Sequence, residues 1–239
     1  MSTHLHLVIL AGGSGSRARR DDQEMPKQFR EIGGTPLVLW SVMTLLEHPD
    51  TVSLTVTCPD GWHEVMNGLL NEAPIPVPWS VVRCGDTRTA STWNALEALA
   101  VSEAAPAPGD LVAVHDAARP FASAELLERL AAAASTHGGA LPAVPVVDTT
   151  IRFDETSGTI DYLPRAELRA VQTPQVFGWE AFYETHRRAH EIGSDTTDDG
   201  GLMAAAGHLP VLVEGELENI KVTTPDDLEA LEELMGDGS

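Results

Sequence analysis

The stretch Leu7–Phe29 reads LVILAGGSGSRARRDDQEMPKQF and joins an apolar run to a glycine-rich segment and then to a long polar one. The apolar run predicts a buried β-strand over His6–Ala11. Gly12, Gly13 and Gly15 follow this strand directly. Because glycine lets backbone N–H groups approach phosphate oxygens closely, the segment predicts an anion-binding turn at the end of the first strand.

Two other glycine-rich motifs compete with this interpretation. Gly13, Gly15 and Ala18 fit the dinucleotide pattern GxGxxG/A, which would indicate a dehydrogenase. That pattern leads directly into an amphipathic helix, whereas residues 17–25 are almost wholly polar and Pro26 follows. The Walker pattern needs a Lys-Ser or Lys-Thr pair, and the sequence has none. A solvated surface loop remains the alternative to a triphosphate-binding loop whose cations are Arg17, Arg19, Arg20 and Lys27.

Apolar, β-branched runs alternate with helical patterns along the rest of the chain. Further strands are predicted at Val52–Cys58, Trp79–Arg83, Leu111–His115 and Ala140–Val144. Helices are predicted at Pro36–Glu47, Gly61–Leu70, Arg88–Leu99, Ala124–Ser135 after the cap Ser123, and from Thr223 or Thr224 to about Met235. The alternation predicts an α/β fold, with a Rossmann-like, mostly parallel sheet and helices on both faces. We expect a single domain over residues 1–239.

Residues 146–169 break this alternation. Strand-like pieces at Thr149–Phe153 and Thr159–Tyr162 flank a Ser157-Gly158 turn, with no helical pattern between them. The stretch therefore predicts a projecting β-hairpin arm. Because an isolated hairpin is only marginally stable, we expect it to pack on a second subunit and act as a dimerisation arm; folding back on its own domain is the alternative.

The net charge limits the partners. Acidic residues number 36 against 15 Lys and Arg, which gives a formal charge of −21. This charge repels a phosphate backbone, so we expect a small ligand and no nucleic acid. The apolar runs are far shorter than the roughly 18–20 residues that span a bilayer, and Met1–Leu10 lacks a secretory signal pattern, so we expect a cytoplasmic protein without membrane contact. The acidity also suggests adaptation to a salty cytoplasm.

Lysine occurs only twice, as Lys27 after the glycine turn and as Lys221 in NIKVTTPDD. A phosphoryl-transfer site needs cations, and lysine supplies a compact charge that arginine does not reproduce geometrically. We expect both lysines to bind phosphate groups. The alternative is that both lysines remain by chance, without a function, in a chain in which nearly every other lysine has been replaced.

The segment VAVHDAARPF places Asp116 just beyond an apolar strand, at the edge where open α/β sheets bind ligands. Mg²⁺ is typically held by one or two carboxylates together with substrate phosphates, so Asp116 is a candidate metal ligand. Arg119 is a candidate phosphate ligand. A turn or helix-cap aspartate is the alternative for Asp116, and His115 is interpreted as a packed histidine without a catalytic role.

In CGDTRTASTWNAL, Gly85 and Asp86 follow a strand, and Ser91 lies in the first turns of the next helix. The main chain at Gly85 and the side chains of Asp86 and Ser91 are candidates for recognising a base edge. A plain turn and a capped helix are the alternative. The triplet TPQ at Thr173–Gln175 and the run TTDD at Thr196–Asp199 are interpreted as helix starts.

Together these segments resemble the 2-C-methyl-D-erythritol 4-phosphate cytidylyltransferase family of the non-mevalonate isoprenoid pathway. The resemblance covers nearly the whole chain in order and rests on AGGSGSR, PKQF, GDTRTAS, HDAARP, VVDT, TPQ, TDD and NIKVT. It implies transfer of CMP from CTP to 2-C-methyl-D-erythritol 4-phosphate, giving 4-diphosphocytidyl-2-C-methyl-D-erythritol and pyrophosphate. It further implies Mg²⁺ or another divalent cation as cofactor, and a homodimer formed through the arm.

The resemblance also implies a role for particular residues. The nucleotide would be held by Ala11, Gly12, Gly13, Ser14, Gly15, Gly85, Asp86 and Ser91. Catalysis would rest on Arg17 and Lys27 at the transition state, and on Arg165 and Lys221, which position the acceptor. The acceptor pocket would also be lined by Asp116, Arg119, Thr149 and Thr197. Of these, Thr149 and Arg165 lie on the arm and would reach the neighbouring subunit's site, and Thr173 would have a supporting role.

Some positions depart from the family pattern: Gly12 stands where alanine is frequent, Ala18 where methionine is frequent, and Thr92 replaces a usual valine. The related ribitol 5-phosphate cytidylyltransferases share the AGG and PKQF segments, so ribitol 5-phosphate is the alternative acceptor. The alanine pair of HDAARP favours methylerythritol phosphate. A nucleotide-binding protein without catalysis is the alternative from a different functional class.

Overall fold

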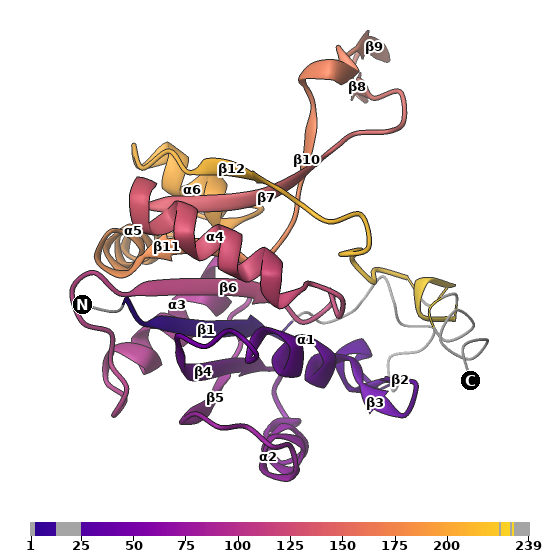
Figure 1. Cartoon of the computed structure of the whole chain (residues 1–239). Helices are drawn as coiled ribbons and strands as arrows, with labels where there is room; N and C mark the ends of the chain where they lie inside the picture. Colours follow the sequence, from indigo (N-terminus) through magenta and orange to yellow (C-terminus); the bar gives the residue numbers. More distant parts are fainter. Residues whose placement is uncertain (1–2, 13–24, 225, 230, 232–239) are drawn as a thin grey trace.

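The first strand, β1, lies in the middle of a mixed sheet and has neighbours on both sides. The computed structural model describes residues 3–12, 25–224, 226–229 and 231 (Figure 1). Within them, an 8-stranded sheet has the order β10-β7-β11-β6-β1-β4-β5, and β12 also pairs with β7. Its strands are β1 (Leu5–Leu10), β4 (Thr51–Cys58), β5 (Trp79–Arg83), β6 (Leu111–Asp116), β7 (Gly139–Pro145), β10 (Arg169–Val171), β11 (Gln175–Gly178) and β12 (Val211–Glu214).

The sheet is mostly parallel. β4, β1 and β6 run parallel to one another, as do β4 and β5, and β12 is parallel to β7. The exceptions are β11, which is inserted antiparallel between β6 and β7, and β10, which is antiparallel to β7. The carboxyl ends of β6, β1, β4 and β5 therefore meet at one edge, which is where open α/β sheets bind ligands.

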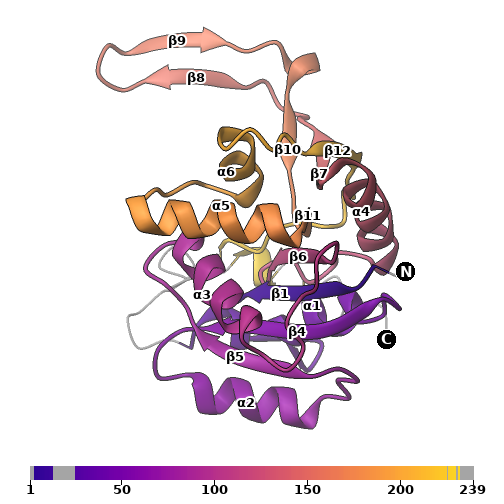
Figure 2. The same cartoon turned by 90° about the vertical axis from the view of Figure 1, so that its left-hand side faces the viewer.

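Helices cover both faces of the sheet (Figures 1 and 2). One core cluster contains residues of α1 (Leu37–Leu45), α2 (His63–Glu72) and α4 (Ala124–His137). The other contains residues of α3 (Arg88–Ala100), α5 (Trp179–Ile192) and α6 (Asp199–Ala205). β1 contributes to both, because alternate side chains of a strand point to opposite faces: Leu5, Leu7 and Ile9 belong to the first cluster and Val8 to the second.

The predicted fold class is confirmed, and the predicted elements of the first 145 residues lie within a few residues of the observed ones. Two caps are also confirmed: Ser123 Oγ accepts from Leu126 N at 3.0 Å, and Thr224 Oγ1 accepts from Asp227 N at 3.2 Å. Residues 226–229 and 231 are helical, and the remainder of the helix predicted to Met235 lies outside the described residues.

The chain after residue 168 holds more structure than the sequence analysis predicted: β10, β11, α5 and β12 were missed, and only the start of α6 was predicted. The interpretation of TTDD as a helix start is correct, since Asp198 caps α6 and accepts from Gly201 N at 3.0 Å. The same interpretation of TPQ is wrong. Thr173 and Pro174 lie in the break between the strands β10 and β11, and Gln175 begins β11.

The predicted hairpin is present as β8 (Ile151–Asp154) and β9 (Thr159–Tyr162), a separate two-stranded sheet. Figure 2 shows it extending well away from the body. All eight strand residues are exposed, so the alternative of an arm folded back on its own domain does not describe this structure. A second small hairpin, β2 (Glu31–Ile32) with β3 (Thr35–Pro36), follows the 3-10 turn η2 (Lys27–Phe29).

The arm has one apolar face. Ile151 pairs with Tyr162 and Phe153 with Ile160, whereas the alternate pairs, Arg152 with Asp161 and Asp154 with Thr159, are polar. Because directly paired residues of an antiparallel ladder share a face, these four side chains form one surface. Each is more than 40% exposed. No helix in the described part of the chain is long and apolar enough to cross a membrane.

Candidate active site

The nucleotide turn begins at the end of β1. Ala11 N donates to Thr57 Oγ1 at 3.0 Å, and Ala11 O accepts from Gln28 Nε2 at 2.6 Å, so the strand end is tied to β4 and to η2. A Cβ on Gly12 would lie 2.2 Å from Cys84 Cβ. Cys84 therefore occupies the space that an alanine at position 12 would need. Four residues predicted to hold or act on the nucleotide, namely Gly13, Ser14, Gly15 and Arg17, lie outside the described residues.

The second predicted part of the nucleotide site lies at the end of β5, beside Gly12. Ser91 Oγ accepts from Gly85 N at 3.0 Å and donates to Thr87 O at 2.8 Å. Thr87 in turn caps α3 through Ala90 N. Ser91 is buried and shapes the turn, whereas the neighbouring Asp86 is exposed. The turn with a capped helix is thus present, and recognition of a base there stays a prediction.

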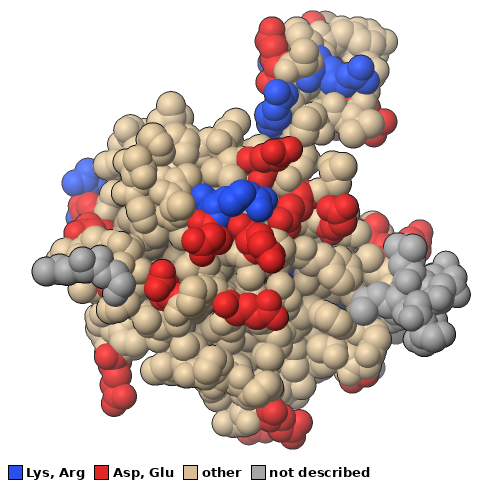
Figure 3. Space-filling view, in the orientation of Figure 1, with Lys and Arg blue, Asp and Glu red and all other residues tan. Residues whose placement is uncertain are grey.

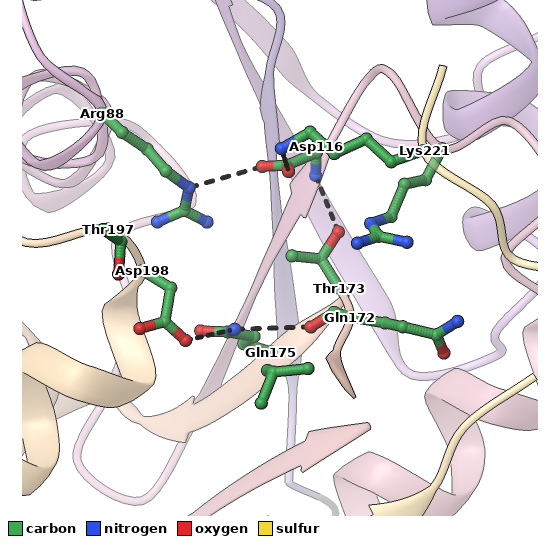
Figure 4. A pocket seen from close by; sticks show the side chains of 10 residues that line it. Arg88, Asp116, Gln172, Thr173, Gln175, Thr197, Asp198 and Lys221 are labelled. Carbon is green, nitrogen blue, oxygen red and sulfur yellow. Dashed lines mark hydrogen bonds and ion pairs between the residues drawn. The ribbon is translucent and has the colours of Figure 1, made fainter. Parts of the chain in front are cut away.

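A cavity of about 310 Å³ opens beside the end of β6 (Figure 4). Four residues predicted for the acceptor line it: Asp116, Arg119, Thr197 and Lys221. They come from widely separated parts of the sequence, and the fold brings them together. The other two do not line this cavity. Thr149 is exposed on the arm, and Arg165 Nη1 donates to Val147 O at 2.8 Å within the arm.

Sequence reasoning missed most of the remaining lining, which consists of Arg88, Val171, Gln172, Thr173, Gln175 and Asp198; of these, only Thr173 was given a supporting role. Arg88 lies inside the quoted GDTRTAS segment, and its place as the first residue of a helix at the ligand-binding edge could have identified it. Gln172 and Gln175 flank the break between β10 and β11. Nothing in the local sequence indicated that this break would lie beside Asp116.

Asp116 lies between two cations. Its Oδ2 is 2.5 Å from Lys221 Nζ, and its Oδ1 is 3.4 Å from Arg88 Nε. Burial by itself would raise the pKa of Asp116, but the charges of Arg88 and Lys221 outweigh burial and hold that pKa below its usual range. The carboxylate is therefore ionised at neutral pH, and it orders both cations at the wall of the cavity.

This arrangement does not support direct binding of magnesium by Asp116. Both of its oxygens face cationic groups, and Asp198, the other carboxylate on the cavity wall, accepts from Gln175 Nε2 at 2.9 Å. The described residues contain no group of three or more His, Cys, Asp or Glu side chains that could hold a metal ion. The donor set that divalent cations prefer is therefore not assembled here by protein groups alone.

The two lysines converge on one segment, residues 219–224, which we call the strap. Lys221 belongs to the strap and binds Asp116, while Lys27 Nζ donates to Val222 O at 2.8 Å. The strap is fixed to the body, because Val222 N donates to Ala118 O at 2.8 Å and Asn219 Nδ2 donates to Thr173 O at 2.8 Å. It thus connects the end of the glycine-rich loop with the cavity.

Arg119 is aimed along the strap. Its Nη1 donates to Asn219 O at 2.7 Å. The same carbonyl accepts from Gln172 Nε2 at 3.2 Å, so two side chains hold one strap oxygen. The cavity wall therefore carries three cations, Arg88, Arg119 and Lys221, each positioned by an oxygen of the protein.

The model of the family described as 2-C-methyl-D-erythritol 4-phosphate cytidylyltransferase matches residues 5–237 of this sequence. The chain belongs to this family. The family predicted from the ordered motifs is therefore confirmed.

Individual relatives support this family assignment. A bifunctional enzyme IspD/IspF from Bradyrhizobium diazoefficiens is 40% identical over 227 residues, covering 92% of this chain and 53% of the relative. The crystal structure of 2-C-methyl-D-erythritol 4-phosphate cytidylyltransferase from Thermus thermophilus is 34% identical, with a TM-score of 0.74 and coverage of 97% of this chain and 98% of that one. The chain spans about half the length of the curated relatives it matches, which are bifunctional.

His115 belongs to the family segment HDAARP and holds the backbone of the neighbouring turn in place. It is fully buried, with Nε2 2.9 Å from Arg119 O and Nδ1 3.1 Å from Thr173 Oγ1. Arg119 O is a carbonyl oxygen and can only accept, so Nε2 carries the imidazole hydrogen and donates to it. Nδ1 of the neutral ring is then an acceptor for the hydroxyl hydrogen of Thr173, whose oxygen also accepts from Asp116 N at 3.1 Å. The interpretation as a packed histidine is consistent with these contacts, which fix the backbone on both sides of the turn.

Burial lowers the pKa of His115 to about 4 from the ordinary value of 6.5. Between these values the unfolded chain binds the proton and the folded chain does not, so folding stability decreases as the pH falls from 6.5 to 4. The full difference is on the order of 3 kcal/mol. We expect the variant His115→Gln to show a flatter dependence of the free energy of unfolding on pH in this window, measured by urea denaturation. His6 also has a lowered pKa, so some slope should persist.

The control is His208→Gln, which removes an exposed histidine far from the turn in sequence. An equally steep pH dependence in His115→Gln and in the unmodified chain would contradict the assignment of a neutral, buried imidazole.

Proposed function

We propose that this protein transfers CMP from CTP to 2-C-methyl-D-erythritol 4-phosphate and releases pyrophosphate, with 4-diphosphocytidyl-2-C-methyl-D-erythritol as the product. The observation that carries the proposal is the cavity at the end of β6, where Arg88, Arg119 and Lys221 surround the carboxylate of Asp116. A small, polyhydroxylated anion suits such a wall, since cations bind its phosphate and a carboxylate accepts from its hydroxyl groups. Membership of the cytidylyltransferase family supports the choice of CTP as donor.

The reaction is an in-line displacement. A phosphate oxygen of the acceptor forms a bond to the α-phosphorus of CTP, and the bond from that phosphorus to the bridging oxygen of pyrophosphate breaks. The attacking phosphate is already ionised at neutral pH, so no covalent enzyme intermediate and no strong general base are required. Catalysis then depends on positioning two anions and on neutralising their charge.

The cations divide between the two substrates. We assign Lys27, with Arg17, to the triphosphate, because Lys27 follows the glycine-rich loop and donates to the strap at Val222 O. We assign Lys221 and Arg119 to the acceptor, because they line the cavity. Each described cation contacts an oxygen of the protein, which is either a neutral carbonyl oxygen or a carboxylate oxygen shared with another cation. A substrate phosphate oxygen, which carries negative charge, can replace that acceptor.

Nucleotide recognition is proposed for the main chain from Ala11 to Gly15 and at Gly85, together with Asp86 and Ser91. Ala11 and Gly12 end β1, and Gly85 follows β5 beside them, which supports a shared role at this edge. Thr197 is assigned to the acceptor.

A divalent cation, Mg²⁺ for preference, is proposed as the cofactor. Since Asp116 faces two cationic side chains, we propose that the ion is bound chiefly by the triphosphate, whose oxygens are ligands that Mg²⁺ prefers. When bound, it would neutralise charge on the departing pyrophosphate.

We further propose that the protein is a homodimer and that the arm is its dimerisation element. The apolar face of Ile151, Phe153, Ile160 and Tyr162 has no cover within the described part of this chain. A two-stranded hairpin gains stability only by packing against something else, and a second copy provides a body of the same kind. Thr149 and Arg165 would then contribute to the partner's site. Figure 3 shows basic side chains on the arm.

The first prediction from the proposed function concerns activity. With CTP and Mg²⁺, we expect release of pyrophosphate in the presence of 2-C-methyl-D-erythritol 4-phosphate, and its loss when EDTA removes the metal. Lys27→Ala should lower turnover by on the order of 10²–10³-fold, because a preorganised donor to the transition state is removed. Arg188→Ala, which removes an exposed arginine on the outside of α5, is the control.

Three outcomes would contradict this assignment. A preference for ribitol 5-phosphate would change the acceptor, CTP binding without pyrophosphate release under either acceptor would indicate a binding protein, and near-normal turnover of Lys27→Ala would exclude its catalytic role.

The second prediction separates acceptor binding from metal binding at Asp116. Asp116→Asn keeps the shape of the side chain but removes the charge that pairs with Lys221 and Arg88. We expect the KM for the acceptor to rise at least about tenfold, because one partner of a largely buried charge pair is lost. The Mg²⁺ concentration at half-maximal activity should not change. A large increase in that concentration, with an unchanged acceptor KM, would restore the metal-ligand assignment.

The third prediction concerns the arm. We expect the protein to sediment as a dimer and the double variant Phe153→Ser/Ile160→Ser to sediment as a monomer with reduced activity, since its apolar face is disrupted. The matched control is Arg152→Ser/Asp161→Ser, which changes the pair between these residues on the opposite, polar face. Loss of the dimer in the control alone, or retention of the dimer in the apolar-face variant, would refute the assignment.

A further inference from the structure

Arg88 is the cation on the cavity wall to which the sequence analysis assigned no role. It is the first residue of α3, directly after the cap Thr87, and its side chain is about 21% exposed. Its guanidinium spans two carboxylates: Nε lies 3.4 Å from Asp116 Oδ1, and Nη1 donates to Asp199 Oδ2 at 2.6 Å. Figure 4 shows Arg88 reaching Asp116 from the side opposite to Lys221.

Asp199 is buried behind this guanidinium and does not line the cavity. Its side chain is 1% exposed, and its Oδ1 lies 3.1 Å from Nε2 of His186, which is also buried. Burial alone would raise the pKa of Asp199, but Arg88 and His186 outweigh it and lower that pKa to about 2. A charged carboxylate at this depth is stable only while its partners stay in place.

The contacts form one chain across four elements. His186 is on α5, Asp199 begins α6, Arg88 begins α3 and Asp116 ends β6. α5 packs against both α3 and α6, so the spacing between the two carboxylates is set by helix packing. Nη2 of Arg88 is buried without a hydrogen-bond partner among the described residues. The orientation of the guanidinium therefore depends on the two carboxylates.

We propose that Arg88 is a positioning residue for the acceptor cavity: it fixes the carboxylate of Asp116, and the buried carboxylate of Asp199 fixes Arg88. With Oδ1 directed to Arg88, Oδ2 is presented to Lys221, so that the acceptor meets a carboxylate and an ammonium in defined places. His186 lies next to the other oxygen of Asp199. This inference rests on the proposed function for the identity of the acceptor.

Arg88 as the bridge and Asp199 as its support are tested by different substitutions. Arg88→Gln removes the charge that links the two carboxylates. Asp199→Asn preserves size but removes the negative charge behind the guanidinium, so Asp116 becomes its only charged partner in this chain of contacts. The guanidinium then shifts towards Asp116 and competes with Lys221. Neither substitution removes a group that the proposed function assigns to CTP.

The experiment measures steady-state kinetics with CTP and 2-C-methyl-D-erythritol 4-phosphate for Arg88→Gln, Asp199→Asn and the double variant. CTP affinity is measured separately by calorimetry. We expect each single variant to raise the acceptor KM by on the order of 10- to 100-fold, the effect of misplacing a binding group by about 1 Å. CTP affinity should stay within about twofold. The double variant should be no more than about twofold worse than the poorer single one, because Asp199 acts through Arg88.

The matched control is Arg187→Gln. Arg187 is also an arginine held by two carboxylates, Glu184 and Glu191, but on the exposed outer surface of α5 beside His186. We expect its acceptor KM to equal that of the unmodified protein. If Arg88→Gln does not fold, Arg88→Lys keeps the charge without a fork that spans two carboxylates, and a raised acceptor KM is expected there as well.

An unchanged acceptor KM in the folded variants, equal losses of CTP and acceptor affinity, or multiplicative effects in the double variant would each overturn the positioning role. These outcomes differ from failure of the proposed function, in which the unmodified protein itself releases no pyrophosphate with this acceptor.

Discussion

The ion pair between Asp116 and Lys221 is the interaction on which the candidate site depends. Asp116 ends the strand next to β1, whereas Lys221 lies more than a hundred residues later on the strap. Their 2.5 Å contact brings the strap to the edge of the sheet. Because removing a charge from water is costly, an aspartate this buried needs compensating cations, and Arg88 is the second of them. The cavity is lined by Asp116 and by the two cations that compensate its charge.

The break between β10 and β11 provides the hydrogen bonds that this charge cluster needs. A continuous strand would use its backbone groups in the ladder, whereas the interruption allows Thr173 and its neighbours to reach other segments. Thr173 Oγ1 accepts from Asp116 N, Gln172 binds the strap at Asn219 O, and Gln175 binds Asp198. One short irregular stretch therefore holds three segments that converge on the cavity. This stretch lies beside β6 because β11 is inserted antiparallel next to that strand.

The strap physically links the two proposed substrate sites. Lys27 enters from the end of the glycine-rich loop and contacts Val222 O, one residue from the lysine that binds Asp116. A displacement of either ammonium acts on the same short segment, which is tied to Ala118 and Thr173. Buried charged networks of this kind contribute modestly to stability compared with apolar packing, but they restrict side chains to few orientations. That restriction is what transfer between two bound anions requires.

The sequence by itself determined the alternation of strands and helices, the projecting hairpin, the family and four residues of the cavity wall, because hydrophobic period, turn residues and ordered motifs are local properties of the chain. It also singled out both lysines. Only the tertiary structure decided that Asp116 faces two cations and not an assembled metal site, that Arg88 bridges Asp116 and Asp199, and that TPQ interrupts a strand. These features join residues distant in sequence, such as Arg88 and Asp199, and their distances depend on how α3, α5 and α6 pack on the sheet. Local patterns carry no information on that packing.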